Sequence, residues 1–192
     1  MNRSSSSRKG SMLVRSLALT FVLALGVTAC GDDDGKDDGN SSVEPDADKA
    51  AATLDEGLKA HAAGDLTTAS EKYRETLEFD NTNKFALYNL ALIDEASGNY
   101  GLAEEKYRAA LKTDPAYEPA LFNLAILRTS SDPKEAIGLY RAAVASNKKD
   151  AAAWLNLGLL LRAAGDKDEG DEAVAKAIEL NPKLKDPAAI AE

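Results

Sequence analysis

Few residues of this chain could perform chemistry. Its 192 residues include one cysteine, Cys30, and one histidine, His61. A single cysteine cannot form an internal disulfide, and a lone histidine cannot complete a metal site or a histidine-based triad. The sequence also contains no glycine-rich phosphate loop, dinucleotide fingerprint or G-x-S-x-G motif. We therefore expect no catalytic residue, no metal site, no cofactor and no enzyme activity, and we interpret His61 as a polar residue that lines a groove.

Cys30 stands at the end of a segment that is typical of a secretion signal. Four basic residues and no acidic residue precede an apolar run at residues 16–26, which is too short to span a bilayer well. The V-T-A-C sequence that ends at Cys30 resembles the lipobox of bacterial lipoproteins. The resemblance implies that residues 1–29 are a signal peptide and that Cys30 becomes the lipidated first residue. The alternatives are an ordinary secretory peptide with an incidental cysteine, or an uncleaved anchor.

The resemblance to lipoproteins also implies a location. Gly31 follows the cysteine, whereas an aspartate at that place retains lipoproteins of enteric bacteria in the inner membrane. We expect the protein in the bacterial cell envelope, lipid-anchored to the outer membrane and facing the periplasm if the host has an outer membrane. Otherwise we expect it on the outer face of the cytoplasmic membrane.

Residues 30–49 are predicted to form the lipidated cysteine and a disordered acidic tether. The segment 31–49 contains eight acidic residues, two lysines and few apolar residues, so it cannot offset the entropy of ordering. Residues 32–38 fit D-x-D-G-x-x-D, a fragment of some calcium loops, but no glutamate follows at the position that an EF-hand requires. A solvated tether is favoured, and calcium binding by the tether stays open.

Residues 50–184 consist of four repeats, at 50–83, 84–117, 118–150 and 151–184, followed by a short tail at 185–192. The second repeat carries Leu87, Leu90, Ala91, Gly98, Tyr100, Ala103, Tyr107, Ala110 and Pro115, and the fourth carries Trp154, Leu157, Gly158, Gly165, Ala177 and Pro182. This pattern resembles the tetratricopeptide repeat, whose unit is two antiparallel helices, A and B. The resemblance implies an all-α fold, a right-handed superhelical α-solenoid of four helix-turn-helix units.

The turns between helices A and B can also be predicted. Gly64, Gly98 and Gly165 should end helix A with a positive φ. The third repeat is one residue shorter and lacks this glycine. Asp132 and Pro133 stand there instead, which predicts a tighter turn with the proline as the first residue of helix B.

Helix A lines a concave groove in the family that the repeats resemble, and the residues facing this groove follow from the register. They are Leu54, Leu58, Phe85, Tyr88, Asn89, Leu92, Phe122, Asn123, Ile126, Leu155, Asn156 and Leu159. An extended peptide could bind with its backbone on the asparagines and its apolar side chains on the remaining residues, or an amphipathic helix could dock there. The alternative is that part of this set belongs to the core.

The expected function is that of an extracytoplasmic scaffold whose groove binds a peptide or amphipathic helix of another envelope protein. A net charge of −9 argues against nucleic acid, which needs a basic surface. A homodimer is possible, because the tail at 185–192 is too short for a full capping helix. The alternative function is therefore a dimerising structural lipoprotein without a peptide-binding groove.

Overall fold

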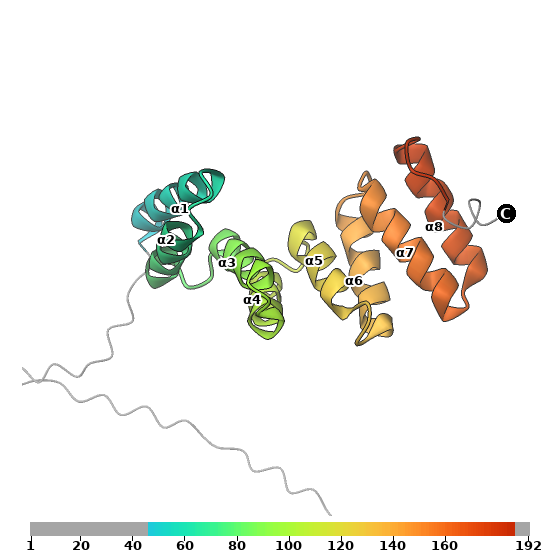
Figure 1. Ribbon diagram of the computed structural model, residues 1–192, viewed down its shortest axis with the longest axis horizontal. Helices are drawn as coiled ribbons and strands as arrows, with labels where there is room; N and C mark the ends of the chain where they lie inside the picture. Colours follow the sequence, from blue (N-terminus) through green and yellow to red (C-terminus); the bar gives the residue numbers. More distant parts are fainter. Residues whose placement is uncertain (1–45, 187–192) are drawn as a thin grey trace, which may run out of the picture. The chain divides into compact units, whose positions relative to one another are not determined.

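The computed structural model describes residues 46–186, and this part of the chain contains eight helices and no strand (Figure 1). The helices are α1 (Ala47–Ala62), α2 (Leu66–Phe79), α3 (Lys84–Ala96), α4 (Tyr100–Thr113), α5 (Glu118–Arg128), α6 (Pro133–Ser146), α7 (Ala151–Ala164) and α8 (Lys167–Leu180). None of these helices is long and apolar enough to cross a membrane. The predicted signal peptide, Cys30 and most of the predicted tether lie outside the described residues.

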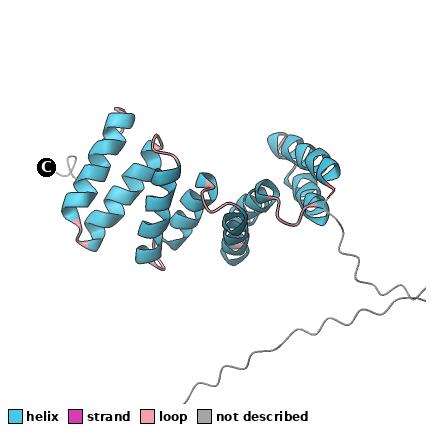
Figure 2. Ribbon diagram, turned by 180° about the vertical axis from the view of Figure 1, so that it is seen from behind, coloured by secondary structure: helices cyan, strands magenta, loops and turns pink. Residues whose placement is uncertain are grey.

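The helices pack as four pairs that follow one another in chain order (Figures 1 and 2). Each odd-numbered helix packs along the even-numbered helix after it. Neighbouring pairs meet through α2 and α3, α4 and α5, and α6 and α7. Each pair corresponds to one sequence repeat and packs mainly against its neighbours, as expected of a solenoid. The predicted all-α fold of four helix-turn-helix units is thus confirmed.

Buried tyrosine side chains and close helix–helix contacts make up the interior. Tyr73, Tyr107 and Tyr140 take equivalent buried positions on α2, α4 and α6. In the fourth pair the helices approach closely, because a Cβ on Gly158 would lie only 2.7 Å from the backbone oxygen of Gly170. Small residues at this position therefore set how near the two helices of a pair can lie.

Three of the four pairs turn through glycine, as predicted. Gly64, Gly98 and Gly165 follow α1, α3 and α7 with φ values of 81°, 77° and 100°. This is the left-handed region, which glycine enters without the steric cost that a Cβ imposes.

The third pair turns differently, and the prediction of a tighter turn was wrong: four residues, 129–132, separate α5 from α6, whereas two or three residues separate the helices of the other pairs. Helix α5 ends at Arg128 after 11 residues, and Pro133 is the first residue of α6, as predicted. Asp132 precedes it and accepts a hydrogen bond from the backbone N–H of Glu135 at 3.0 Å. The turn is fixed by this cap and by the backbone N–H of Asp132, which donates to the carbonyl of Arg128 at 2.8 Å.

The first helix begins inside the segment that was predicted to be a tether. Asp46 accepts a hydrogen bond from the N–H of Lys49 at 3.1 Å, and the Asp46 N–H donates to the carbonyl of Phe79 at 3.2 Å. Residues 47–49 are consequently the first turn of α1. The prediction of disorder failed for these residues because the acidic composition concealed an N-cap.

The C-terminal tail is tied back to the last pair within the described residues. The Arg162 guanidinium on α7 donates to both carboxylate oxygens of Asp186, at 2.7 and 2.9 Å. It also donates to Asp171 on α8 at 2.6 Å. Such a bidentate ion pair fixes the relative orientation of the two side chains and also stabilises their contact.

Candidate functional site

The twelve residues predicted to line the groove all lie on the odd-numbered helices, and none belongs to the buried core. Leu58, Phe85 and Ile126 are 44%, 45% and 44% exposed. The other nine are partly buried: Leu54, Tyr88, Asn89, Leu92, Phe122, Asn123, Leu155, Asn156 and Leu159. We call the nine members that are not asparagine the apolar strip.

Some residues of the apolar strip also support the core. Leu54 packs against the core between the first two pairs, Tyr88 and Leu92 pack against the next core cluster, and Phe122 packs against the third. The ring centroids of Phe122 and Tyr140 are 5.9 Å apart in a near-perpendicular arrangement. These partly exposed side chains therefore also support the core, as the alternative interpretation of the sequence expected, and binding on their exposed side stays a prediction.

Aromatic rings cluster around the part of the apolar strip that lies on α3. Phe85 and Tyr88 both pack edge-on against Tyr117, with ring centroids 5.8 and 5.4 Å away. The Lys84 ammonium lies 5.1 Å from the ring centroids of Phe85 and Tyr117 and binds Asp114 at 2.5 Å. Burial raises the pKa of Tyr117 to about 12 and also raises that of Tyr88. The lysine that lies near both rings is therefore already paired with a carboxylate.

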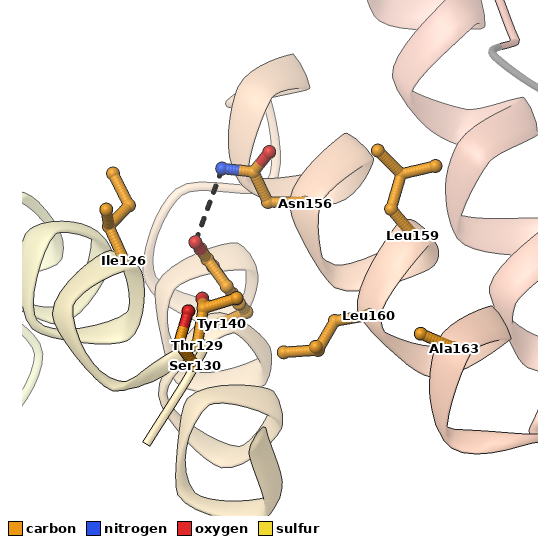
Figure 3. Close-up of a pocket in the computed structure, with 8 residues that line it drawn as sticks. All are labelled: Ile126, Thr129, Ser130, Tyr140, Asn156, Leu159, Leu160 and Ala163. Carbon is orange, nitrogen blue, oxygen red and sulfur yellow. Dashed lines mark hydrogen bonds between the residues drawn. The ribbon is translucent and has the colours of Figure 1, made fainter. Parts of the chain in front are cut away.

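The asparagines are less free than the sequence predicted. Asn123 donates to the Tyr88 hydroxyl at 3.1 Å, and Asn156 donates to the Tyr140 hydroxyl at 3.3 Å (Figure 3). Asn89 donates to a carbonyl of its own helix at 2.8 Å. Each amide has thus committed one N–H within the chain, which leaves fewer donors for the backbone of an extended peptide.

On α1 and α3, the residues about one turn after the apolar strip contact the hydroxyls of the buried tyrosines. His61 lies 3.2 Å from the Tyr73 hydroxyl, and the Tyr107 hydroxyl donates to Glu95 at 2.8 Å. The equivalent residue of the third repeat is the smaller Thr129. Within residues 46–186, no group of three or more histidine, cysteine, aspartate or glutamate side chains is placed to hold a metal ion.

Three open cavities follow the apolar strip. The α3–α5 cavity, of about 360 Å³, is lined by Leu92, Glu95, Ala96, Tyr100 and Asn123. The α4–α5 cavity, of about 390 Å³, is lined by Tyr100, Gly101, Glu104, Ile126, Leu127 and Ser131. The α5–α7 cavity, of about 510 Å³, is lined by Ile126, Thr129, Ser130, Tyr140, Asn156, Leu159, Leu160 and Ala163 (Figure 3). Shared lining residues place the three cavities in a row.

The cavities bring together five predicted residues: Leu92, Asn123, Ile126, Asn156 and Leu159. The remaining seven border none of these three cavities. Sequence reasoning missed Tyr100, which lines two cavities, and Thr129, which lines the largest. The signal for Thr129 was present in the shortened third repeat, because a missing residue must change where helix A ends.

Glu118, at the start of α5, supplies a pH-dependent test of how the repeats pack. Burial and the neighbouring Asp150 carboxylate raise the pKa of Glu118 to about 7. A raised carboxyl pKa favours the protonated form in the folded state, so stability falls as pH rises from about 4.5 to about 7. Glu118→Gln should be more stable than the wild type by about 1–2 kcal/mol above pH 7, after allowance for solvent screening.

Urea unfolding at pH 4 and pH 8 measures this effect. The stabilisation by Glu118→Gln should appear at pH 8 and nearly vanish at pH 4, where the wild-type carboxyl is mostly protonated in both states. Glu78→Gln, at an exposed position of α2, is the matched control and should change little at either pH. The same stabilisation at both pH values would show that the two carboxylates do not interact.

The sequence matches the tetratricopeptide repeat family over residues 54–118 and 125–184, which is more than half of the chain. No curated protein matches it.

Solved structures share the fold. MamA from Desulfovibrio magneticus RS-1 is 24% identical, with a TM-score of 0.62 over 71% of this chain and 78% of that chain. The pilF protein of Pseudomonas aeruginosa is 24% identical, with a TM-score of 0.61 over 71% of this chain and 63% of that chain. An O-GlcNAc transferase of Thermobaculum terrenum is 26% identical, with a TM-score of 0.54 over 60% of this chain but only 22% of the enzyme. These similarities establish the solenoid fold alone.

Proposed function

The chain belongs to the tetratricopeptide repeat family, and from this premise we propose that it is a membrane-anchored, extracytoplasmic scaffold that binds another protein of the cell envelope. Solenoids of this kind generally act as protein-binding surfaces. The partner contributes a peptide or an amphipathic helix, which docks on the apolar strip. The similarity to an enzyme over 22% of its length concerns the solenoid alone and does not add a catalytic role.

One observation carries the binding proposal: large apolar side chains are exposed on three successive odd-numbered helices. Leu58 on α1, Phe85 on α3 and Ile126 on α5 are all more than two-fifths exposed. Single exposed apolar residues need no explanation, but exposed apolar residues on successive helices, one of which lines two open cavities, are typical of an interaction site. The strip therefore has the composition and the shape of a docking surface.

The anchor and the compartment rest on the sequence around Cys30. The apolar run at 16–26 and the V-T-A-C sequence support lipidation of this cysteine after removal of residues 1–29. The acidic segment that follows then holds the helical units away from the bilayer, because its like charges repel one another and the anionic surface. On this basis the partner is an envelope protein.

The alternative of self-assembly through the last helix gains no support from the exposed side of α8. The exposed residues of this helix are Lys167, Asp168, Glu169, Asp171, Glu172, Ala175 and Glu179. All but one are charged, and a crowded acidic surface opposes pairing with a second copy of itself.

Placing carboxylates on the strip tests the binding proposal. Leu58→Asp and Ile126→Asp should each reduce recovery of the partner from an envelope extract at least about tenfold, since burying each apolar side chain contributes about 1.5–3 kcal/mol. Leu102→Asp is the matched control, because Leu102 is 49% exposed but lies on α4. Equal losses from all three variants, or from none, would contradict docking on the strip.

A further inference from the structure

The largest of the three cavities lies beside the C-terminal end of α5, the shortest helix of the described residues. Helix α5 has 11 residues, whereas α3 has 13 and α7 has 14. Thr129 and Ser130 leave the helix and line the α5–α7 cavity instead. The Thr129 hydroxyl donates to the carbonyl of Ala125 at 2.8 Å, which satisfies an acceptor that the interrupted helix leaves open.

The residue type at Thr129 also keeps this cavity open. Equivalent positions in the other repeats carry His61, Glu95 and Arg162, all with longer side chains. His61 and Glu95 contact buried tyrosine hydroxyls, and Arg162 binds Asp186. Thr129 also interacts with the hydroxyl of Tyr140, but its side chain is the shortest of the four and takes up the least space beside the cavity that it lines.

The lining of the α5–α7 cavity selects for a neutral, apolar occupant. None of its eight lining residues is charged, and four of them are aliphatic (Figure 3). Bringing an ionised group into such a site would cost free energy that no residue of the lining could offset. A cavity of about 510 Å³ lies in the range of small-ligand pockets and accommodates a large side chain.

The hydrogen bonds of the asparagines favour one of the two forms of partner. Asn89, Asn123 and Asn156 each commit an N–H within the chain. An extended peptide needs donors and acceptors from its receptor for its backbone, whereas a helix satisfies its own backbone. A groove with engaged amides and apolar cavities therefore suits a helix better.

We propose that the α5–α7 cavity is the anchor site of the groove and receives one large uncharged side chain from the apolar face of an amphipathic helix in the partner. The anchor is leucine, phenylalanine, tryptophan or methionine. Lysine and arginine flank the apolar face of that helix, because acidic side chains outnumber basic ones within residues 46–186. This inference rests on the proposed function and specifies the partner chemistry of the same groove.

The test selects helices from a phage library against the full-length chain in lipid nanodiscs. The library displays 18-residue alanine-rich helices randomised along one face. The best binder is synthesised, and its Kd is measured for the wild type, for Ala163→Trp, which fills the cavity from an exposed position, and for Ala62→Trp. Ala62 is the matched control, because it holds the equivalent exposed position in the first repeat.

We expect the selected binder to carry a large apolar residue as its anchor. The Kd of this binder should be about tenfold to a hundredfold higher for Ala163→Trp than for the wild type, and unchanged for Ala62→Trp. A proline at the centre of the binder should abolish binding. Ser130→Trp fills the same cavity from its other side and replaces Ala163→Trp if circular dichroism shows that the latter misfolds.

Several outcomes would overturn the anchor site. The binder could carry a charged residue as its anchor, or it could still bind with a proline at its centre. Its Kd could be the same for Ala163→Trp as for the wild type. Finally, the chain could form a dimer that Ala163→Trp dissociates. A binder that is weakened by Phe85→Asp but not by Ala163→Trp would place the anchor elsewhere and leave the proposed function intact. If none of the selected binders responds to any variant of the strip, the anchor site and the proposed function are both overturned.

Discussion

Replacing Gly158 by alanine is expected to loosen the fourth helix pair and to lower the free energy of unfolding by about 1–3 kcal/mol. A Cβ at this position would lie 2.7 Å from the backbone oxygen of Gly170 and 2.8 Å from the backbone nitrogen of Val174. These atoms belong to α8 and cannot move aside singly, so the two helices must separate. The better helix propensity of alanine, about 0.5–1 kcal/mol, offsets only part of that cost.

Gly138→Ala on α6 is the matched control for this prediction. Apart from its chain neighbours and the nearby backbone of its own helix, no heavy atom lies within 4 Å of a Cβ built on Gly138, so alanine there should stabilise the chain by about 0.5–1 kcal/mol. Urea unfolding followed by circular dichroism measures both changes. Stabilisation by both substitutions would show that α7 and α8 do not approach as closely as the structure indicates.

Replacing Cys30 by serine is expected to abolish lipid attachment. In our proposal the acyl chains on this residue supply the entire anchor, since two or more chains hold a protein stably where one is marginal. Serine has no sulfur to receive the diacylglycerol. Cells fed labelled palmitate should therefore label the wild type and leave Cys30→Ser unlabelled, and the firm membrane attachment should be lost.

Gly31→Ala is the control for the lipid experiment, because it changes the adjacent residue and keeps the sulfur. Fractionation after an alkaline carbonate wash reports attachment independently of the label. Undiminished labelling of Cys30→Ser, together with attachment as firm as that of the wild type, would assign the anchor to another part of the chain.

The repeats made the fold predictable because each structural requirement recurs in the sequence. Gly64, Gly98 and Gly165 mark the turns where a positive φ is needed, and each was found there. Pro133 marked the first residue of α6 even where the turn glycine was missing. Local rules of this kind depend on residue type and spacing alone.

The candidate site was less predictable, because it depends on how side chains from different repeats meet. The register placed Asn123 and Asn156 on the groove side, but it did not show that each donates to a tyrosine hydroxyl. Nor did it show that Tyr88 contributes to both the groove and the core. Hydrogen bonds between helices follow from packing, which no single repeat encodes.

The start of α1 escaped prediction for a related reason. Composition over residues 31–49 indicated disorder, while the cap at Asp46 depends on one hydrogen bond and on the carbonyl of Phe79, 33 residues away in the sequence. Average charge is a property of a segment, but a helix begins at a particular residue. Boundaries are therefore the part of a repeat array that composition predicts least well.

Photo-crosslinking in the native envelope tests docking on the apolar strip most directly. A photoreactive amino acid is placed at Ile126, which is 44% exposed on α5, and in a second protein at Leu102, which is 49% exposed on α4. Our account predicts that one foreign protein crosslinks from Ile126 and not from Leu102. Crosslinks to the same protein from Leu102 alone, or equally from both positions, would contradict a partner seated on the strip.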